Sequence, residues 1–406
     1  MKYQKFSAII FSLAVIAGSQ LYVSAQTAGP RVFLLSAKTL RENKQKLADP
    51  KINDPDLKAG LAKLERNAQK ALKTEVLPIT SKSAVPPSGD KHDYVSQAPY
   101  FWKNPDTKDG LPYIKKDGQR NPEIKSFPDH DLLDKMEKPV KDLAAAYYFT
   151  GKEEYAAKAA EILRMWFLDP KTLMNPNLEY AQFVPGQKEG RNFGIIETRE
   201  ITRVLDSVGL LNGSKSWTKS DQAGIEAWFD KYFTWLTTSS HGKDEARAKN
   251  NHGTWYDVQV TAIALFLGKT DAAKKTLESA EQNRIAKQIE PDGSEPLELA
   301  RTKSWSYSVM NLEGLVNLAL LGDAAGVNLW DFQTKDGRSI RRAVEFLMPY
   351  TDPKNKWTRE QIEPFKADPL FAVVRRTSGK YTDDKYAKIL SSTPRSEDDS
   401  TLLLGY

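Results

Sequence analysis

The 406-residue sequence contains no cysteine and only four histidines. Without cysteine, disulfides, thiolate metal sites, iron–sulfur clusters and cysteine nucleophiles are excluded. The histidines are His92, His130, His241 and His252, and no two of them have the HxxxH or HExxH spacing of a zinc motif. The sequence therefore predicts neither a cofactor nor a histidine-based metal site, while a calcium ion held by carboxylates stays open.

Long apolar runs are also scarce. The one marked run, Phe6 to Ala17, follows Lys2 and Lys5 and precedes Val23-Ser24-Ala25, which is the pattern of a secretory signal peptide. The run is too short to span a bilayer, and no later stretch approaches about 18 uninterrupted apolar residues. We expect cleavage after Ala25 and a periplasmic or secreted domain at 26–406 without a membrane span.

Charge of neither sign dominates. Lysine and arginine total 59 and aspartate and glutamate 53, so the net charge is +6, and removal of Lys2 and Lys5 with the signal peptide leaves 6 − 2 = +4. This mild excess is compatible with an anionic partner but does not identify one.

Strand patterns are scarce, and helical patterns come in pairs separated by short breaks. Residues 36–73 carry a helical pattern interrupted at Asp49-Pro50 and Asp54-Pro55. Further helices are expected at 132–149, 153–167, 193–211, 219–238, 254–267, 271–288, 306–321, 337–348 and 382–390. So many hairpins around one core favour an all-α fold, an incomplete α/α toroid (barrel) of helical hairpins, over a four-helix bundle.

Residues 77–128 interrupt the helical pattern with eight prolines. Loops of that length inside a domain are usually functional. The segment is rich in aromatics, which are Tyr94, Tyr100, Phe101, Trp102 and Tyr113. Either these side chains fix the loop to the body of the domain, or the loop is a lid whose aromatics stack on sugar rings.

A first polar motif, Asn250-Asn251-His252, stands at the start of the apolar segment 258–267. Amide and imidazole groups at a helix start lie near unpaired backbone N–H donors, which suits binding of a carboxylate. A helix cap with a structural histidine is the alternative interpretation.

A second motif runs from Glu298 through Arg301 to Tyr307 and leads into the apolar segment 309–321. Arg301 and Tyr307 are six residues apart and would not share a face of one helix, but on a turn that enters a helix they can converge on a cleft. The alternative is a core tyrosine beside an arginine in a structural ion pair.

These motifs, with Gly194-Ile-Ile-Glu197-Thr-Arg199 and the loop segment 94–123, resemble the alginate lyase superfamily of polysaccharide lyases with α/α-toroid folds. The resemblance covers about residues 94–347. It is closer to polysaccharide lyase family 38 than to family 5, because Ser308 rather than histidine follows Tyr307. The resemblance implies that Tyr307 and His252 are the catalytic pair.

The implied reaction can be examined on chemical grounds. β-Elimination at a 4-linked uronate requires a neutralised carboxylate, a base for the C5 proton and an acid for O4. Asn251 and Arg301 suit the neutralisation, and Tyr307 suits the proton transfers if Arg301 lowers its pKa. On mannuronate or glucuronate the proton and O4 share a face, so one tyrosine can serve. On guluronate they do not, and His252 is the only histidine suitably placed as the second group.

The expected partner is an anionic polysaccharide, and the family resemblance implies alginate first. No nucleic acid partner is expected. Gln97, Tyr100 and Trp102 are candidate substrate contacts, with Arg199 a further partner for a uronate carboxylate. Three alternatives stay open, namely a glucuronan lyase, a non-catalytic periplasmic glycan-binding protein and a glycoside hydrolase. The hydrolase would use two carboxylates, with candidates Asp257, Glu197 and Glu298.

Overall fold

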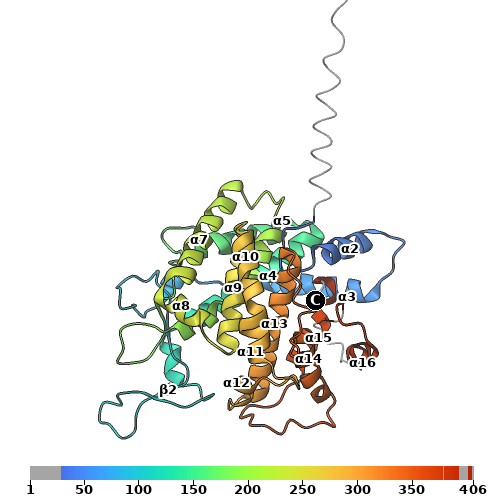
Figure 1. Cartoon of the computed structure of the whole chain (residues 1–406). Coiled ribbons are helices and arrows are strands. Elements are labelled where there is room, and N and C mark those ends of the chain that lie inside the picture. Colours follow the sequence, from blue (N-terminus) through green and yellow to red (C-terminus); the bar gives the residue numbers. More distant parts are fainter. Residues whose placement is uncertain (1–28, 378, 393–400, 405–406) are drawn as a thin grey trace, which may run out of the picture.

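The computed structural model describes residues 29–377, 379–392 and 401–404, so the predicted signal peptide lies outside the described residues. Helices dominate the structure (Figure 1). The α-helices are α2 (Ala37–Ala48), α3 (Pro55–Leu72), α4 (Asp129–Thr150), α5 (Glu153–Phe167), α6 (Ile201–Leu210), α7 (Lys219–Thr238), α8 (Ser240–Ala246), α9 (Asn251–Phe266), α10 (Thr270–Ala280), α11 (Ala286–Gln288), α12 (Pro296–Leu299), α13 (Ser304–Ala325), α14 (Ile340–Leu347), α15 (Asp368–Thr377), α16 (Asp384–Ser392) and α17 (Thr401–Leu404).

The remaining elements are short. The turns of 3₁₀ or π type are η1 (Ile79–Ser81), η2 (Pro122–Ser126), η3 (Asn192–Thr198), η4 (Glu281–Ile285) and η5 (Met348–Thr351). The strands within the described part are β1 (Val95–Gln97), β2 (Phe101–Trp102), β3 (Ile114–Lys115) and β4 (Tyr180–Phe183). The all-α prediction is thus confirmed.

Two helices form the centre of the molecule. Every residue of α9 from Gly253 to Phe266 is buried, and α13 is buried along most of its length. A helix that is apolar on all sides must be covered on all sides, and α10 and α13 pack against α9 (Figure 1). The polar motifs of both helices lie at their amino-terminal ends, so the packing of α9 against α13 brings the two motifs together.

The helices are arranged as hairpins that follow one another around the core. The αL residue Gly151, with φ of 68°, ends α4 and turns the chain into α5, and these helices pack together as predicted. Thr218 caps α7 in a reciprocal pair with Asp221. At the other end of the chain, α17 packs against α2 and α3, and Leu403 accepts a hydrogen bond from Asn43.

The structure departs from the predicted helices in several places, and α8 and α15 were not predicted. The expected helix 193–211 is divided into η3 and α6, and 271–288 is divided into α10, the π turn η4 and α11. The predicted end of the helix 306–321, before Gly322, is wrong, because α13 continues to Ala325 and ends at the αL residue Gly326. Gly322 is instead needed for packing, since a Cβ there would lie 2.3 Å from the carbonyl oxygen of Val327.

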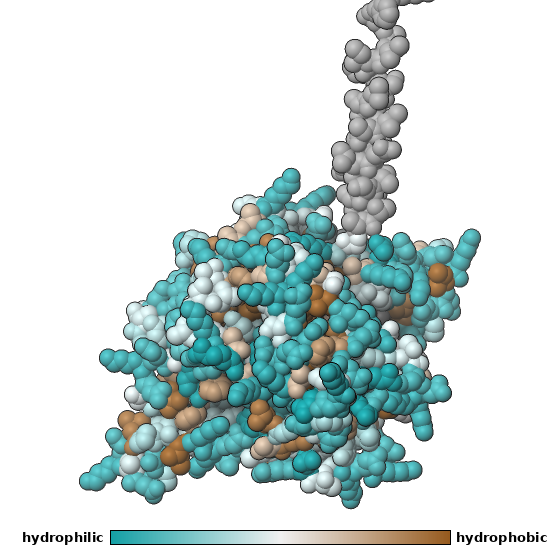
Figure 2. All heavy atoms as spheres, in the orientation of Figure 1, coloured by the Kyte–Doolittle hydropathy of each residue, from teal (hydrophilic) through white to brown (hydrophobic). Residues whose placement is uncertain are grey.

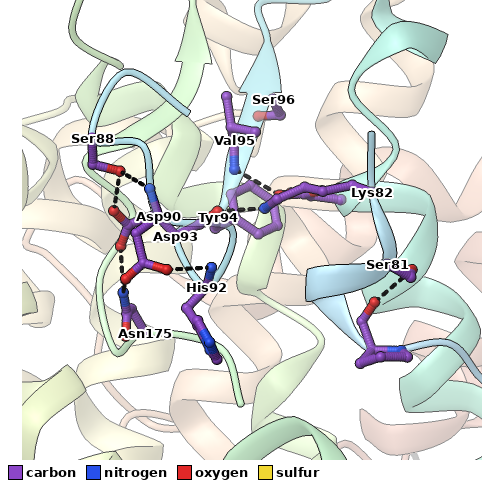
Figure 3. A network of polar contacts seen from close by, with 12 residues as sticks. Ser81, Lys82, Ser88, Asp90, His92, Asp93, Tyr94, Val95, Ser96 and Asn175 are labelled. Atoms are coloured by element: carbon purple, nitrogen blue, oxygen red, sulfur yellow. Dashed lines mark hydrogen bonds and ion pairs between the residues drawn. The ribbon is translucent and has the colours of Figure 1, made fainter. Parts of the chain in front are cut away.

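The loop region 77–128 is fixed to the domain by buried polar contacts (Figure 3). The Lys82 ammonium reaches the carbonyl of Asp93 and pairs with Asp129, at 2.5 Å from Oδ2, and the Val95 amide donates to the same oxygen. Asp93 also accepts from Ser88 and Asn175. These bonds hold β1, which pairs in parallel with β4, while β2 pairs with β3. The region therefore has defined structure.

The visible surface is mainly hydrophilic, with apolar side chains in small separate groups (Figure 2). Within the described residues, no helix is both long and apolar enough to cross a bilayer.

Candidate active site

A cavity of about 720 Å³ lies between the loop region and the amino-terminal ends of α9 and α13. Seven of the eight predicted site residues line it, and these are Gln97, Tyr100, Arg199, Asn251, His252, Arg301 and Tyr307. Trp102 is not among the lining residues. Lysines and arginines outnumber carboxylates along its wall, with Lys115, Arg120, Lys125, Arg191, Arg199, Arg301 and Lys303 against Asp131, Glu197 and Glu363. The cavity therefore favours an anionic ligand.

Tyr307, in the first turns of α13, reaches the cavity with its hydroxyl next to that of Tyr100, at 2.8 Å. The Arg301 guanidinium carbon lies 3.8 Å from the centre of the Tyr307 ring. Burial and the adjacent Tyr100 raise the pKa of Tyr307 well above its usual range, and Arg301 offsets only part of this effect. The expected lowering of the Tyr307 pKa is thus wrong for the ligand-free protein, which holds this side chain as a neutral phenol.

Arg301 is not a free cation. Its Nε and Nη2 donate to both carboxylate oxygens of Asp117, with the closest contact at 2.7 Å, and Thr302 donates to the same carboxylate. Burial alone would raise the pKa of Asp117, but the bonds from Arg301 and Thr302 lower it to about 2. The ion pair connects the loop region to the start of α13. Arg301 therefore forms the structural ion pair of the alternative interpretation and also lines the cavity.

His252 is held by a buried carboxylate. Its Nδ1 lies 2.6 Å from Oε1 of Glu245, which is 0% exposed and also accepts from Asn192. A carboxylate accepts hydrogen bonds, so Nδ1 is the nitrogen that donates to Glu245, and in the neutral imidazole Nε2 then carries the lone pair. This is the arrangement of a histidine that acts as a base.

The backbone around His252 leaves room only for glycine at residue 253. A Cβ on Gly253 would lie 2.2 Å from the carbonyl oxygen of Ala248. The same oxygen accepts from Arg284, which lies in the π turn η4 and forms a buried two-bond ion pair with Asp257. This pair fixes the connection between α8 and α9 and thereby the approach of Glu245 to His252.

Asn251 is fully buried at the start of α9. Its backbone N–H and its Nδ2 both donate to Glu298, each at 2.7 Å. Asn250 is the N-cap residue of α9, but no side-chain hydrogen bond caps the helix there. Asn251 Oδ1 has no hydrogen-bond partner.

The other predicted contacts divide into two kinds. Gln97 is buried at the end of β1 with its Nε2 unpartnered, and Arg199 lies at the wall 3.6 Å from Glu200. Trp102 instead lies in the β2–β3 hairpin, where its Nε1 donates to Gln119. The position of the Trp102 side chain therefore does not support the predicted contact with substrate.

Some residues of the site were missed by the sequence analysis. Glu245 stands in no recognisable sequence motif, and nothing in the sequence distinguishes it from the other acidic residues. His130, at the start of α4, also lines the cavity with an unpartnered Nδ1, so the expectation that His252 is the only suitably placed histidine is wrong. The sequence around His130, next to the proline-rich loop region, gives no sign that His130 lies at the cavity.

The sequence matches the family model described as alginate lyase over residues 78–357. The chain belongs to the alginate lyase family. Membership of this family confirms the resemblance of the motifs and makes the protein a polysaccharide lyase. A comparison with curated proteins found no match.

Solved structures agree with the family. An alginate lyase from Bacteroides ovatus is 38% identical, with a TM-score of 0.87 over 93% of this chain and 99% of that one. Alginate lyase A1-III from Sphingomonas species A1 is 18% identical, with a TM-score of 0.59 over 94% and 98% of the two chains. A variant of A1-III complexed with tetrasaccharide is 16% identical, with a TM-score of 0.61 over 93% and 96%. The α/α-toroid prediction is confirmed.

In this alginate lyase family member, the three carboxylates predicted for the hydrolase alternative do not form a suitable pair. Asp257 is paired with Arg284, and Glu298 is 1% exposed and held by Asn251. Glu197 lines the cavity but accepts from Tyr94 and Ser96. An acid and a base of a hydrolase would both need to reach the sugar.

Proposed function

We propose that the protein cleaves a 4-linked polyuronate, alginate first, by β-elimination that leaves a 4,5-unsaturated uronate. The observation that carries this proposal is the meeting of Tyr307, His252, Asn251 and Arg301 at one cation-lined cavity. The 38% identity to the Bacteroides ovatus alginate lyase supports alginate as the substrate. Glucuronan is the second candidate, because glucuronate shares the same-face geometry of mannuronate.

Tyr307 donates the proton to the departing O4. Its raised pKa keeps the hydroxyl protonated before the reaction, which is the state an acid needs. On guluronate, Nε2 of His252 takes the C5 proton from the opposite face, and Glu245 stabilises the imidazolium that forms. The C5–H electrons then form the C4–C5 double bond as the C4–O4 bond breaks.

On mannuronate the base must approach from the same face as the acid, so Tyr307 has to act in both steps. This requires the phenolate before C5 deprotonation. The Arg301 guanidinium over its ring is the adjacent positive charge that favours this form. Because Tyr307 is a neutral phenol in the free protein, the guluronate route, which needs no phenolate, is the easier one.

Hydrogen-bond donors at the cavity neutralise the uronate carboxylate. Nε2 of Gln97 is a buried donor without a partner, so a bound carboxylate would remove the cost of leaving it unsatisfied. Arg199 and Arg301 add positive charge, and Asn251 adds an amide. Stabilising the enolate-like intermediate is the main electrostatic task of such a site.

We also propose that the signal-like segment 1–25 directs export and that the enzyme acts in the periplasm or outside the cell on its anionic polysaccharide. Analysis of the amino terminus of the protein purified from its own cells tests this point. A mature start at Gln26 is expected, and retention of residues 1–25 would contradict it.

One assay separates the functions. The purified protein is incubated with guluronate-rich and mannuronate-rich alginate, glucuronan and glycosaminoglycans, and the ultraviolet absorbance of the unsaturated product is followed. Absorbance with an alginate polymer is the expected result. Reducing ends without absorbance would indicate hydrolysis, and binding without either product would indicate a glycan-binding protein.

A further inference from the structure

The contact between Asn251 and Glu298 conflicts with the task proposed for Asn251. Nδ2, the donor end of the side chain, is engaged by Glu298 at 2.7 Å, and Oδ1 is the end without a partner in this cavity-lining residue. An amide oxygen accepts hydrogen bonds but cannot donate them. In this orientation Asn251 would repel the uronate carboxylate that it is meant to neutralise.

The same orientation also has an internal cost. Asn251 is 0% exposed, and its Oδ1 has no hydrogen-bond partner. A buried acceptor without a partner has lost its hydration without any compensating hydrogen bond. Buried polar atoms of this kind are rare in native proteins and call for an explanation.

Protonation of the Glu298 carboxylate would remove both conflicts. The two ends of an amide have nearly the same shape, and half a turn about the Cβ–Cγ bond exchanges them. If Glu298 is a carboxylic acid, its O–H can donate to Asn251 Oδ1 while its other oxygen still accepts the Asn251 backbone N–H. Asn251 Oδ1 and both oxygens of Glu298 are then satisfied, and Nδ2 takes the position that Oδ1 held at the cavity wall.

The surroundings of Glu298 are compatible with this proton. Burial raises the pKa of Glu298, while the bonds from Asn251 and the charges of Arg301 and His252 lower it. The effect of burial is larger, so the pKa of Glu298 is raised. Arg301 already shares its charge with Asp117. A second carboxyl, Glu295, is 3% exposed nearby, and burial together with the charge of Glu298 raises the pKa of Glu295 well above its usual value. Two negative charges in this buried segment would repel each other.

We propose that Glu298 is a positioning residue that stays protonated in the active enzyme and turns Nδ2 of Asn251 toward the uronate carboxylate. This inference rests on the proposed function of Asn251 as a neutralising group. Glu298 itself does not line the cavity, so it acts through Asn251.

Glu298→Gln and Glu298→Ala together test the proposal. The glutamine amide reproduces the protonated acid, because its Nε2 donates to Asn251 Oδ1 and its Oε1 accepts the backbone N–H. We expect Glu298→Gln to keep kcat within about threefold of wild type, whereas Glu298→Ala loses about 10²–10³-fold in kcat, the scale for one lost oxyanion donor. Wild-type activity should fall as pH rises through the Glu298 pKa, and Glu298→Gln should lack that fall.

The opposite pattern would overturn the proposal. If the ionised carboxylate is the working form, glutamine brings an N–H against the Asn251 Nδ2, and Glu298→Gln should lose as much kcat as Glu298→Ala while retaining the wild-type melting temperature.

Infrared spectroscopy tests the proton without using activity. A difference spectrum between wild type and Glu298→Gln at neutral pH should contain the C=O band of one protonated carboxyl, and Glu295, present in both proteins, cancels. Absence of that band means an ionised Glu298 and refutes the inference even if the enzyme is a lyase. Presence of the band in a protein without lyase activity would instead refute the proposed function alone.

Discussion

The contact between His252 and Glu245 gives a prediction whose size follows from the structure. Glu245→Gln keeps the shape of the side chain but removes the charge that Nδ1 of His252 contacts at 2.6 Å. Loss of a hydrogen bond to a charged partner costs about 1.5–3 kcal/mol. Since 1.4 kcal/mol is a factor of ten, kcat on guluronate-rich alginate should fall roughly 10- to 150-fold.

The dependence on substrate identifies the cause. His252 is proposed as the base for guluronate, so Glu245→Gln should lose less on mannuronate-rich polymer, where Tyr307 acts alone. Initial rates are followed by the absorbance of the unsaturated product on both polymers, with melting temperature as a check on folding. Asp244→Asn, which changes an exposed neighbour paired with Arg247, is the matched control and should behave as wild type.

A double variant makes the test stricter. If Glu245 acts through His252, then Glu245→Gln combined with His252→Gln should be no worse than His252→Gln alone. Additive losses, or equal proportional losses on the two polymers, would refute the assignment of His252 as a base oriented by Glu245.

Three further predictions concern the wall of the cavity. Asn251→Ala should lose roughly 2.7–4 kcal/mol of transition-state stabilisation, mainly in kcat; a change in KM alone would point to uniform substrate binding. Trp102→Ala should lower the melting temperature and leave oligosaccharide affinity unchanged, because Trp102 does not line the cavity; reduced affinity in isothermal titration would restore the stacking hypothesis. The pKa of Asp117 in the folded protein is about 2, below its usual value of 3.8, so its ion pair with Arg301 stabilises the protein above pH 4 and is lost as pH falls toward 2. The melting temperature of Asp117→Asn should therefore lie below that of wild type at neutral pH and approach it in acid, and a constant difference would contradict this.

Much of the helical architecture follows from the sequence, because apolar periodicity and turn residues are local signals. Gly151 and Thr218 mark helix boundaries that the structure confirms. Gly322 misleads for a physical reason, since it permits close packing inside α13 instead of ending the helix. The division at η3 and the π turn at η4 depend on tertiary contacts, such as the buried pair of Arg284 with Asp257, and these cannot be read from periodicity.

The site residues illustrate the same limit. The motifs at the starts of α9 and α13 converge because these helices pack against each other. Glu245 lies seven residues before His252, Asp117 comes from the loop region, and Glu298 of the second motif pairs with Asn251 of the first. None of these pairings has a local sequence pattern. The ionisation of Tyr307 was predicted in the wrong direction because the sequence shows Arg301 nearby but not its neutralisation by Asp117 or the burial of the ring.

The central claim is that the Tyr307 hydroxyl transfers the proton to O4. Tyr307→Phe keeps the aromatic ring beneath Arg301 and removes only this hydroxyl. On guluronate-rich alginate, the account predicts an unchanged melting temperature and a loss of about 10²–10⁴-fold in kcat, measured from the absorbance of the unsaturated product. Near-wild-type turnover by a folded Tyr307→Phe protein would contradict it.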